Sequence, residues 1–117
     1  MKFQRSDRVA GALLKLVSQL LNEEVNDPRI GIVTLTGAEV SHDLKHARIY
    51  VSPLGEKGKR DEILSGLKSA TGFIRTRVAK ELRMRFAPEI EFVYDETPDQ
   101  ARRIENLLKQ VKEHPES

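Results

Sequence analysis

The sequence predicts a single α+β domain in which a three-stranded sheet carries helices on one face. Three observations support this prediction. The length of 117 residues is that of one domain with one modest core. Apolar residues recur at helical spacing in some segments and alternate with polar residues in others. The segments follow in the order helix, strand, strand, helix, helix, strand, helix, and helices gathered on one side bury a half-apolar sheet.

The first predicted helix begins at Ser6 or Asp7, because a short oxygen side chain accepts from the free N–H groups of a first turn. We expect it to end near Val25, since residues 26–28 read Asn-Asp-Pro and contain turn formers and a residue without an N–H donor. Its apolar stripe is spaced by four, three and four residues, at Val9, Leu13, Leu16 and Leu20.

Two strands, over residues 30–41 and 47–52, are predicted to form an antiparallel hairpin around a turn at 42–45. The alternation of the first strand changes phase after Gly37, which indicates a β-bulge. Pro88 opens a third strand over residues 90–95, where apolar and polar side chains again alternate.

Two further helices are predicted over residues 61–70 and 73–85, separated by Ala70-Thr71-Gly72. Gly72 is expected to adopt a positive φ or to let another backbone approach, so that a valine there would impair packing. A last helix is expected over about 98–113, after a core of about 5–96.

Composition excludes several classes of function. The chain has no cysteine, so we expect neither disulfides nor thiolate metal sites, and a cytoplasmic location. No apolar run approaches the roughly 20 residues of a membrane span, and no signal peptide is predicted. His42 and His46 flank a turn without further ligands, so no metal or other cofactor is expected. Asp95 and Glu96 are interpreted as surface charge.

Charge is distributed unevenly although the net charge is only +2. Residues 68–85 hold six basic side chains and one acidic one, whereas residues 89–99 hold five acidic side chains and no basic one. Such polarisation suits a polyanionic partner. The pattern alone leaves open that the basic run is an ordinary solvated helix face.

The junction at Ala70-Thr71-Gly72 offers a place for RNA. A helix that starts there would point free N–H groups outward, and helix N-termini attract phosphate. The alternative interpretation is a turn between two helices that requires a glycine for its backbone conformation and has no role in binding. Glu91 and Asp95 on the outer sheet face disfavour that face as an RNA platform, although Tyr50 offers a stacking surface there. Lys2 and Arg5 could extend a basic surface. The candidate RNA-binding residues are Arg8, Lys45, Arg48, Lys68, Ala70, Thr71, Gly72, Arg75, Arg77, Lys80, Arg83 and Arg85.

Several stretches occur in the order typical of one family. They are Arg8-Val9, Asp27-Pro28-Arg29-Ile30-Gly31, Glu39-Val40-Ser41-His42-Asp43-Leu44, Ala47-Arg48-Ile49-Tyr50-Val51, Ala70-Thr71-Gly72-Phe73-Ile74-Arg75, Leu82-Arg83-Met84-Arg85, Pro88-Glu89-Ile90-Glu91-Phe92, Tyr94-Asp95, and Arg103 with Asn106-Leu107. With this ordered set, over roughly residues 5–112, the chain resembles the bacterial ribosome-binding factor A family.

The resemblance implies a KH-like type II domain with an interhelical Ala-x-Gly kink, which Ala70-Thr71-Gly72 matches. It implies binding to the free or immature 30S subunit and to small-subunit rRNA, near the 5′-terminal helix and the decoding region. It also implies help in late 30S maturation and rRNA 5′-end processing, often with a role in cold adaptation, and no catalysis. Ribosomal proteins and assembly GTPases are further candidate partners of an expected monomer.

Two other classes of function remain open from the residues. The acidic segment 89–99 could meet a basic ribosomal protein, which would make the domain a protein–protein module. A small nuclease could use Asp95, Glu96 and a metal ion, although the remaining ligands of such a site are not evident.

Overall fold

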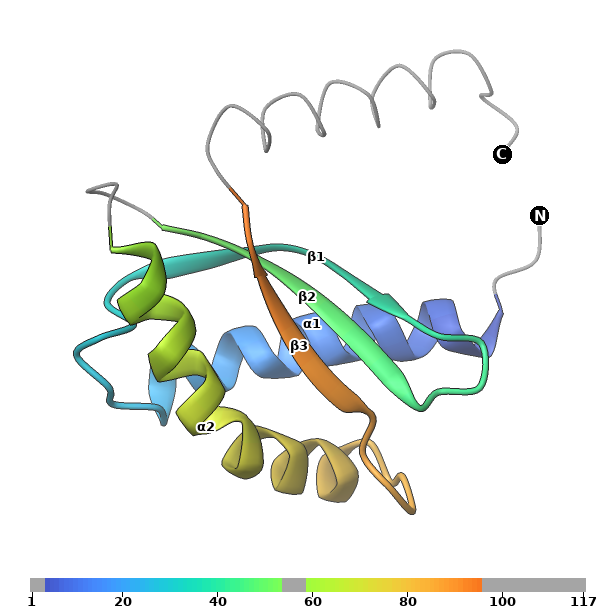
Figure 1. Ribbon diagram of the computed structural model, residues 1–117. Helices are drawn as coiled ribbons and strands as arrows, with labels where there is room; N and C mark the ends of the chain where they lie inside the picture. Colours follow the sequence, from blue (N-terminus) through green and yellow to red (C-terminus); the bar gives the residue numbers. More distant parts are fainter. Residues whose placement is uncertain (1–3, 54–58, 96–117) are drawn as a thin grey trace, which may run out of the picture.

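The computed structural model describes residues 4–53 and 59–95 of the chain. Two helices and three strands occur there, in the order α1 (Arg5–Glu23), β1 (Val33–Val40), β2 (His46–Pro53), α2 (Arg60–Glu81) and β3 (Glu89–Tyr94) (Figure 1). The central strand β2 pairs antiparallel with β1 and parallel with β3. A parallel pair requires a crossover connection, which α2 provides. The predicted α+β class and three-stranded sheet are confirmed.

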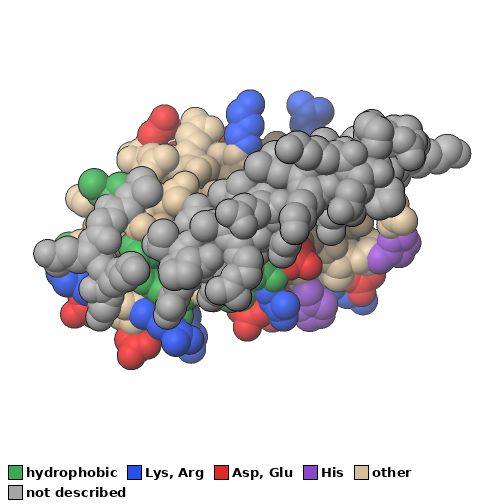
Figure 2. All heavy atoms as spheres, turned by 90° about the horizontal axis from the view of Figure 1, so that it is seen from above, with side chains coloured by type: hydrophobic (Ala, Val, Ile, Leu, Met, Phe, Trp, Pro, Cys, Tyr) green, Lys and Arg blue, Asp and Glu red, His purple; other side chains and the backbone are tan. Residues whose placement is uncertain are grey.

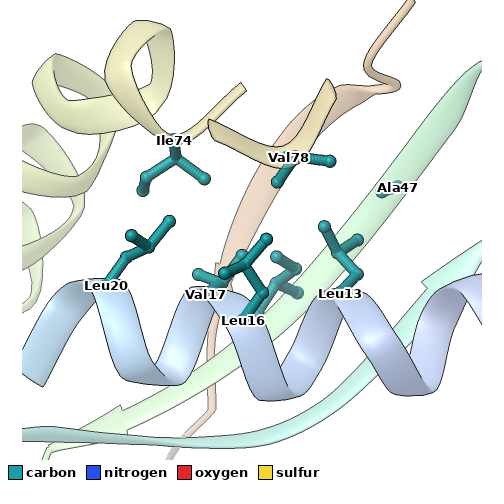
Figure 3. Close-up of a cluster of buried hydrophobic side chains, with 8 residues drawn as sticks. Leu13, Leu16, Val17, Leu20, Ala47, Ile74 and Val78 are labelled. Carbon is teal, nitrogen blue, oxygen red and sulfur yellow. The ribbon is translucent and has the colours of Figure 1, made fainter. Parts of the chain in front are cut away.

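The core lies between the two helices and one face of β2. Basic and acidic side chains are interspersed where the surface is visible in Figure 2. The cluster of buried side chains drawn in Figure 3 is apolar. Ala47, Ile49 and Val51 alternate along β2 and therefore share one face. The helices contribute Leu13, Leu16, Val17 and Leu20 from α1, and Ile63, Leu67, Ile74 and Val78 from α2. Both helices thus cover the same face of the sheet, as predicted.

The strands follow the predicted pattern with shifted ends. Leu35 lies opposite Val51 and Gly37 opposite Tyr50, so Thr36 is the extra residue of a β-bulge. The antiparallel hairpin, its turn and the bulge at Gly37 are therefore confirmed. Helix α1 begins at Arg5, slightly earlier than predicted, because Gln4 and Asp7 form a reciprocal capping box.

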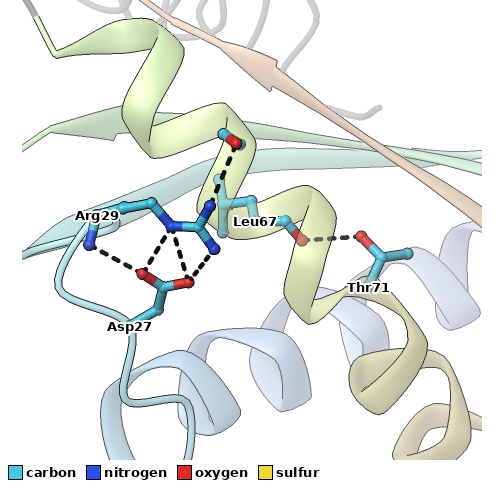
Figure 4. Close-up of polar contacts among 5 residues, drawn as sticks. Asp27, Arg29, Leu67 and Thr71 are labelled. Atoms are coloured by element: carbon cyan, nitrogen blue, oxygen red, sulfur yellow. Dashed lines mark hydrogen bonds and ion pairs between the residues drawn. The ribbon is translucent and has the colours of Figure 1, made fainter.

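The two helices predicted over 61–70 and 73–85 are wrong, because residues 60–81 form the single helix α2. The helix bends part-way along its length (Figure 1). The Thr71 hydroxyl donates to the Leu67 carbonyl at 2.9 Å (Figure 4), and the Thr76 hydroxyl donates to the Gly72 carbonyl at 3.0 Å. Hydroxyls that bond back to the preceding turn bend helices without ending them.

The expectations for Gly72 are corrected as well. Its φ is not positive, and a Cβ added there would have no heavy atom within 4 Å. A continuous helix also has no N-terminus at this point, so the expected set of outward N–H groups does not exist.

A different glycine permits a close approach between segments. A Cβ added at Gly66 would lie 2.7 Å from Cγ1 of Ile30 and 3.3 Å from Cβ of Arg29. The Arg29 guanidinium and backbone N–H both donate to the Asp27 carboxylate, and the guanidinium also reaches Ser65 of α2 (Figure 4). These hydrogen bonds hold the pKa of Asp27 below its ordinary value. The connection between α1 and β1 is thereby fixed against α2.

The predicted C-terminal helix and Glu96 fall outside the described residues, as do residues 54–58 between β2 and α2. Among the helices that are described, none is long and apolar enough to cross a membrane.

Candidate nucleic-acid interface

A cavity of about 530 Å³ lies where the start of α1, the turn between β1 and β2, and the segment after α2 meet. We call it the basic groove, because four of its side chains are basic and two are acidic. Its lining comprises Arg5, Asp43, Leu44, Lys45, His46, Arg83, Met84, Arg85, Phe86, Ala87 and Glu89. Three predicted RNA-binding residues, Lys45, Arg83 and Arg85, come together here from separate parts of the sequence.

The turn that supplies Lys45 and His46 is held by side-chain oxygens. The Ser41 hydroxyl donates to the Asp43 carboxylate at 2.7 Å, and that carboxylate also accepts the Lys45 backbone N–H at 3.0 Å. The His46 backbone N–H donates to the Ser41 hydroxyl at 3.0 Å. The hydrogen bond from Ser41, followed by that from Lys45, keeps the pKa of Asp43 below its ordinary value. The turn therefore presents its basic side chains from a fixed backbone.

Arg83 occupies the position after α2 that glycine usually fills. The Met84 N–H donates to the Ala79 carbonyl at 2.9 Å and the Arg83 N–H to the Lys80 carbonyl at 3.4 Å, which is the Schellman arrangement. The residue between these bonds must adopt a left-handed conformation, and Arg83 has φ of +53°. An L-residue other than glycine pays roughly 1–2 kcal/mol for this conformation.

Leu44 is the other non-glycine residue with a positive φ, of +63°, in the part of the chain that the structure describes. It belongs to the turn at residues 41–46 and lines the same groove as Arg83. Strained backbone positions concentrate at functional sites, where the surrounding structure holds them in place. Two such positions in the lining of one groove mark it as a candidate site.

The lining of the groove combines charged and aromatic side chains. The Arg85 guanidinium carbon lies 5.5 Å from the centroid of the Phe86 ring, and 76% of Phe86 is exposed. Within residues 4–53 and 59–95, no ion pair engages Arg5, Lys45, Arg83 or Arg85. Among the described residues, the groove thus holds four cations that have no ion-pair partner.

Three other predicted RNA-binding arginines have partners inside the protein. Arg48 pairs with Glu91 across β2 and β3 at 3.1 Å. Arg77 pairs with Glu24 at 2.6 Å and with Glu81 at 2.7 Å, and the hydrogen bond that it donates to Glu24 is the main reason that its pKa is raised. The third of them, Arg75, donates to two backbone carbonyls, as described below. A role of these three in RNA binding stays a prediction.

The remaining predicted residues are dispersed. Lys68 and Thr71 line a second cavity of about 340 Å³ between α2 and β3. Ala70 packs against the core, while Arg8, Gly72 and Lys80 are exposed outside both cavities. The residues that the sequence predicted for RNA binding did not include Arg5, His46 and Phe86, which line the basic groove. An aromatic residue directly after the Arg-x-Arg run was the available signal for Phe86.

Arg75 fixes the segment that leads from α2 to β3. Its Nε donates to the Pro88 carbonyl and its terminal nitrogen to the Ala87 carbonyl, both at 3.0 Å. Arg75→Met should lower the free energy of unfolding by about 1–3 kcal/mol, because two half-buried carbonyls lose their donors. Urea unfolding measures this, with Lys80→Met on the same helix as a control that should change stability by less than about 0.5 kcal/mol. Equal stability of the two variants would contradict the assigned role.

The interpretation of Asp95 as surface charge is wrong, since only 4% of this residue is exposed. Its N–H donates to the Val51 carbonyl, which continues the pairing with β2, and its carboxylate accepts from the Thr36 hydroxyl at 3.0 Å. Thr36, the extra residue of the bulge in β1, thus gives the buried carboxylate of Asp95 a hydrogen-bond donor. In the described ranges, no group of three or more His, Asp or Glu residues is arranged to hold a metal ion.

Comparison with known proteins assigns the family. The family model of ribosome-binding factor A matches residues 5–108. The ribosome-binding factor A of Geobacter metallireducens is 50% identical over 93% of this chain and 92% of its own length. The solution structure of a putative ribosome-binding factor A from Thermotoga maritima is 38% identical, with a TM-score of 0.68 over 76% of this chain and 85% of that one.

A likeness in fold extends to a more distant structure. A homology model of ribosome-binding factor A from Thermus thermophilus, fitted into the cryo-EM map of a complex with 30S, is 24% identical with a TM-score of 0.59, over 72% of this chain and 88% of that one. The family model covers most of this chain, and the relative from Geobacter shares half of the aligned residues. The chain therefore belongs to the ribosome-binding factor A family.

Proposed function

We propose that this protein binds small-subunit rRNA on the free or immature 30S subunit and assists late 30S maturation and rRNA 5′-end processing without catalysis. The observation that carries the proposal is the basic groove, where Lys45, Arg83 and Arg85 converge with Arg5. Membership of a family of ribosome-binding factors supports it, as does the relative from Thermus thermophilus that was fitted into a 30S complex.

Binding in the groove rests on phosphate contacts. Lysine and arginine side chains that neutralise phosphates release counterions, which supplies affinity without reading sequence. A protein that binds one rRNA conformation more tightly than another shifts the population toward it by that difference in affinity, and no bond needs to be made or broken. Maturation is thereby assisted by binding alone.

The proposal includes a KH-like type II classification. The mixed sheet, with α2 crossing between the parallel strands β2 and β3, supports it. The bend in α2, next to the hydroxyl of Thr71, takes the place of the interhelical kink. We further propose that the protein acts as a cytoplasmic monomer, with ribosomal proteins and assembly GTPases as additional partners.

Sedimentation tests the proposal directly. Purified protein mixed with free 30S subunits, 50S subunits or 70S ribosomes is run on sucrose gradients at several salt concentrations. We expect it to travel with free 30S and to be released as salt rises. Protein that stays at the top of every gradient would refute 30S binding. Retention by ribosomal proteins after nuclease digestion of the rRNA would instead favour a protein–protein module.

A further inference from the structure

We infer that the Phe86 ring, backed by Arg85, is a stacking platform for one unpaired RNA base, whose phosphate lies in the basic groove. This inference deepens the proposed function and rests on it. It identifies the ligand class at this site as single-stranded nucleotides in a loop, bulge or end. Within a duplex, each base is already stacked between its neighbours and offers no free face.

The exposure of Phe86 is not explained by the fold. The neighbouring side chains Met84 and Ala87 pack against the core, and Pro88 is fully buried. Phe86 belongs to neither core cluster and leaves 76% of its surface exposed, against 43% for Phe73 on α2. A single exposed apolar side chain is common on protein surfaces, so exposure alone decides nothing. Its surroundings are what point to a ligand.

Arg85 prepares the ring for a base. Its guanidinium carbon lies 5.5 Å from the ring centroid, within the range of a cation–π interaction. That interaction restricts the ring's orientation and occupies one face, and the high exposure of Phe86 leaves surface open for stacking. Bases stack on aromatic rings irrespective of sequence, because every base has a π-face.

The groove supplies the complementary half of a nucleotide site. Phe86 lines the same cavity as Arg5, Lys45 and Arg83, so a stacked base would have its own phosphate among three cations. The cavity volume of about 530 Å³ accommodates more than one small organic group. Aromatic and basic side chains in one groove are the combination that single-strand binding proteins use. Phosphate contacts are made by the cations and do not involve the Phe86 ring, so the ring indicates a base as well.

The test measures binding of a fluorescently labelled single-stranded RNA oligonucleotide and of the duplex with the same sequence. Phe86→Leu should weaken single-strand binding about 5- to 150-fold, the range for loss of one base–aromatic stack, and leave duplex binding unchanged. Phe86→Trp should restore binding. Because the chain has no other tryptophan, its fluorescence should be quenched by the single strand and not by the duplex.

The matched control is Phe73→Leu. Phe73 also lies beneath an arginine, with the Arg77 guanidinium 5.7 Å from its centroid, but it does not line the groove. This variant should bind single strands as the wild type does. Circular dichroism melting of each variant verifies that it is folded.

The outcomes separate the inference from the proposed function. If Phe86→Leu binds the single strand like the wild type while 30S sedimentation persists, the stacking platform is refuted and the proposed function stands. If Phe86→Leu loses 30S binding but keeps single-strand binding, the ring contacts a ribosomal protein and the inference is also refuted. If the wild type sediments with no ribosomal particle, the proposed function itself fails.

Discussion

Arg83→Gly is expected to make the protein more stable and its binding to 30S weaker. The gain in the free energy of unfolding is about 0.5–1 kcal/mol, because glycine adopts the left-handed conformation at the end of α2 without the strain that Arg83 bears at φ of +53°. The expected loss of binding follows from the phosphate contact that we propose for Arg83. Urea unfolding and 30S sedimentation measure the two effects separately.

Combining this change with Arg85→Gln should have the largest effect on binding. Hydrogen bonds to charged groups contribute roughly 1.5–3 kcal/mol each, so two lost contacts lower the affinity for 30S about a hundredfold or more. The dependence of log affinity on log salt should also flatten by roughly 0.7–0.9 for each lost phosphate contact. Neither arginine takes part in an ion pair within residues 59–95 or 4–53, so the fold should remain intact.

The double variant Lys15→Gln and Arg60→Gln is the matched control. It removes the same two charges from exposed positions on α1 and α2 that do not line the basic groove. We expect the control to bind 30S nearly as the wild type does. If both double variants lose affinity equally, net charge governs binding and the groove is not the site. If the double variant of Arg83 and Arg85 binds 30S like the wild type, the rRNA contacts another surface.

The fold was largely predictable because its signals are local. Alternation in β2 and the four-three-four spacing in α1 each identify an element and its buried face without knowledge of the rest. The bulge at Gly37 was also visible as a change of phase. What local patterns do not contain is pairing direction, so the parallel arrangement of β2 and β3 came only from the structure.

The junction at residues 70–72 shows how a local signal can mislead. An isolated glycine costs a helix only about 1 kcal/mol relative to alanine, which is too little to interrupt a 22-residue helix that packs along the sheet. Tertiary packing, with Ile74 and Val78 buried beyond the junction, keeps the helix continuous. A bend does occur, as the predicted kink required, but it results from the threonine hydroxyls and not from a strained glycine.

The candidate site was only partly predictable for a related reason. The basic run identified Arg83 and Arg85, but sequence does not show which cations are already engaged within the fold. Arg77 meets Glu24, which is 53 residues away, and Arg75 meets carbonyls of the next segment. The left-handed conformation of Arg83, with φ of +53°, was likewise not predictable from the sequence.

Gly66→Val is expected to destabilise the protein strongly. The new Cβ would lie 2.7 Å from Cγ1 of Ile30, a buried side chain that is fixed between α2 and the connection after α1. Forcing extra carbons into a packed interior costs about 3 kcal/mol at such a site, which lowers the melting temperature by roughly 15 °C. Gly72→Val on the same helix should be nearly neutral, since its Cβ meets nothing within 4 Å.

A double-mutant cycle identifies the clash itself. Ile30→Ala alone should destabilise the protein by about 2–5 kcal/mol, because it leaves a cavity. In the presence of Gly66→Val that cavity receives the new side chain, so the combined loss should be smaller than the sum of the two single losses by more than about 1 kcal/mol. Additive losses would show that Gly66 is required for another reason. If Gly66→Val destabilises the protein no more than Gly72→Val does, the connection at residues 27–30 does not pack against α2 in this way.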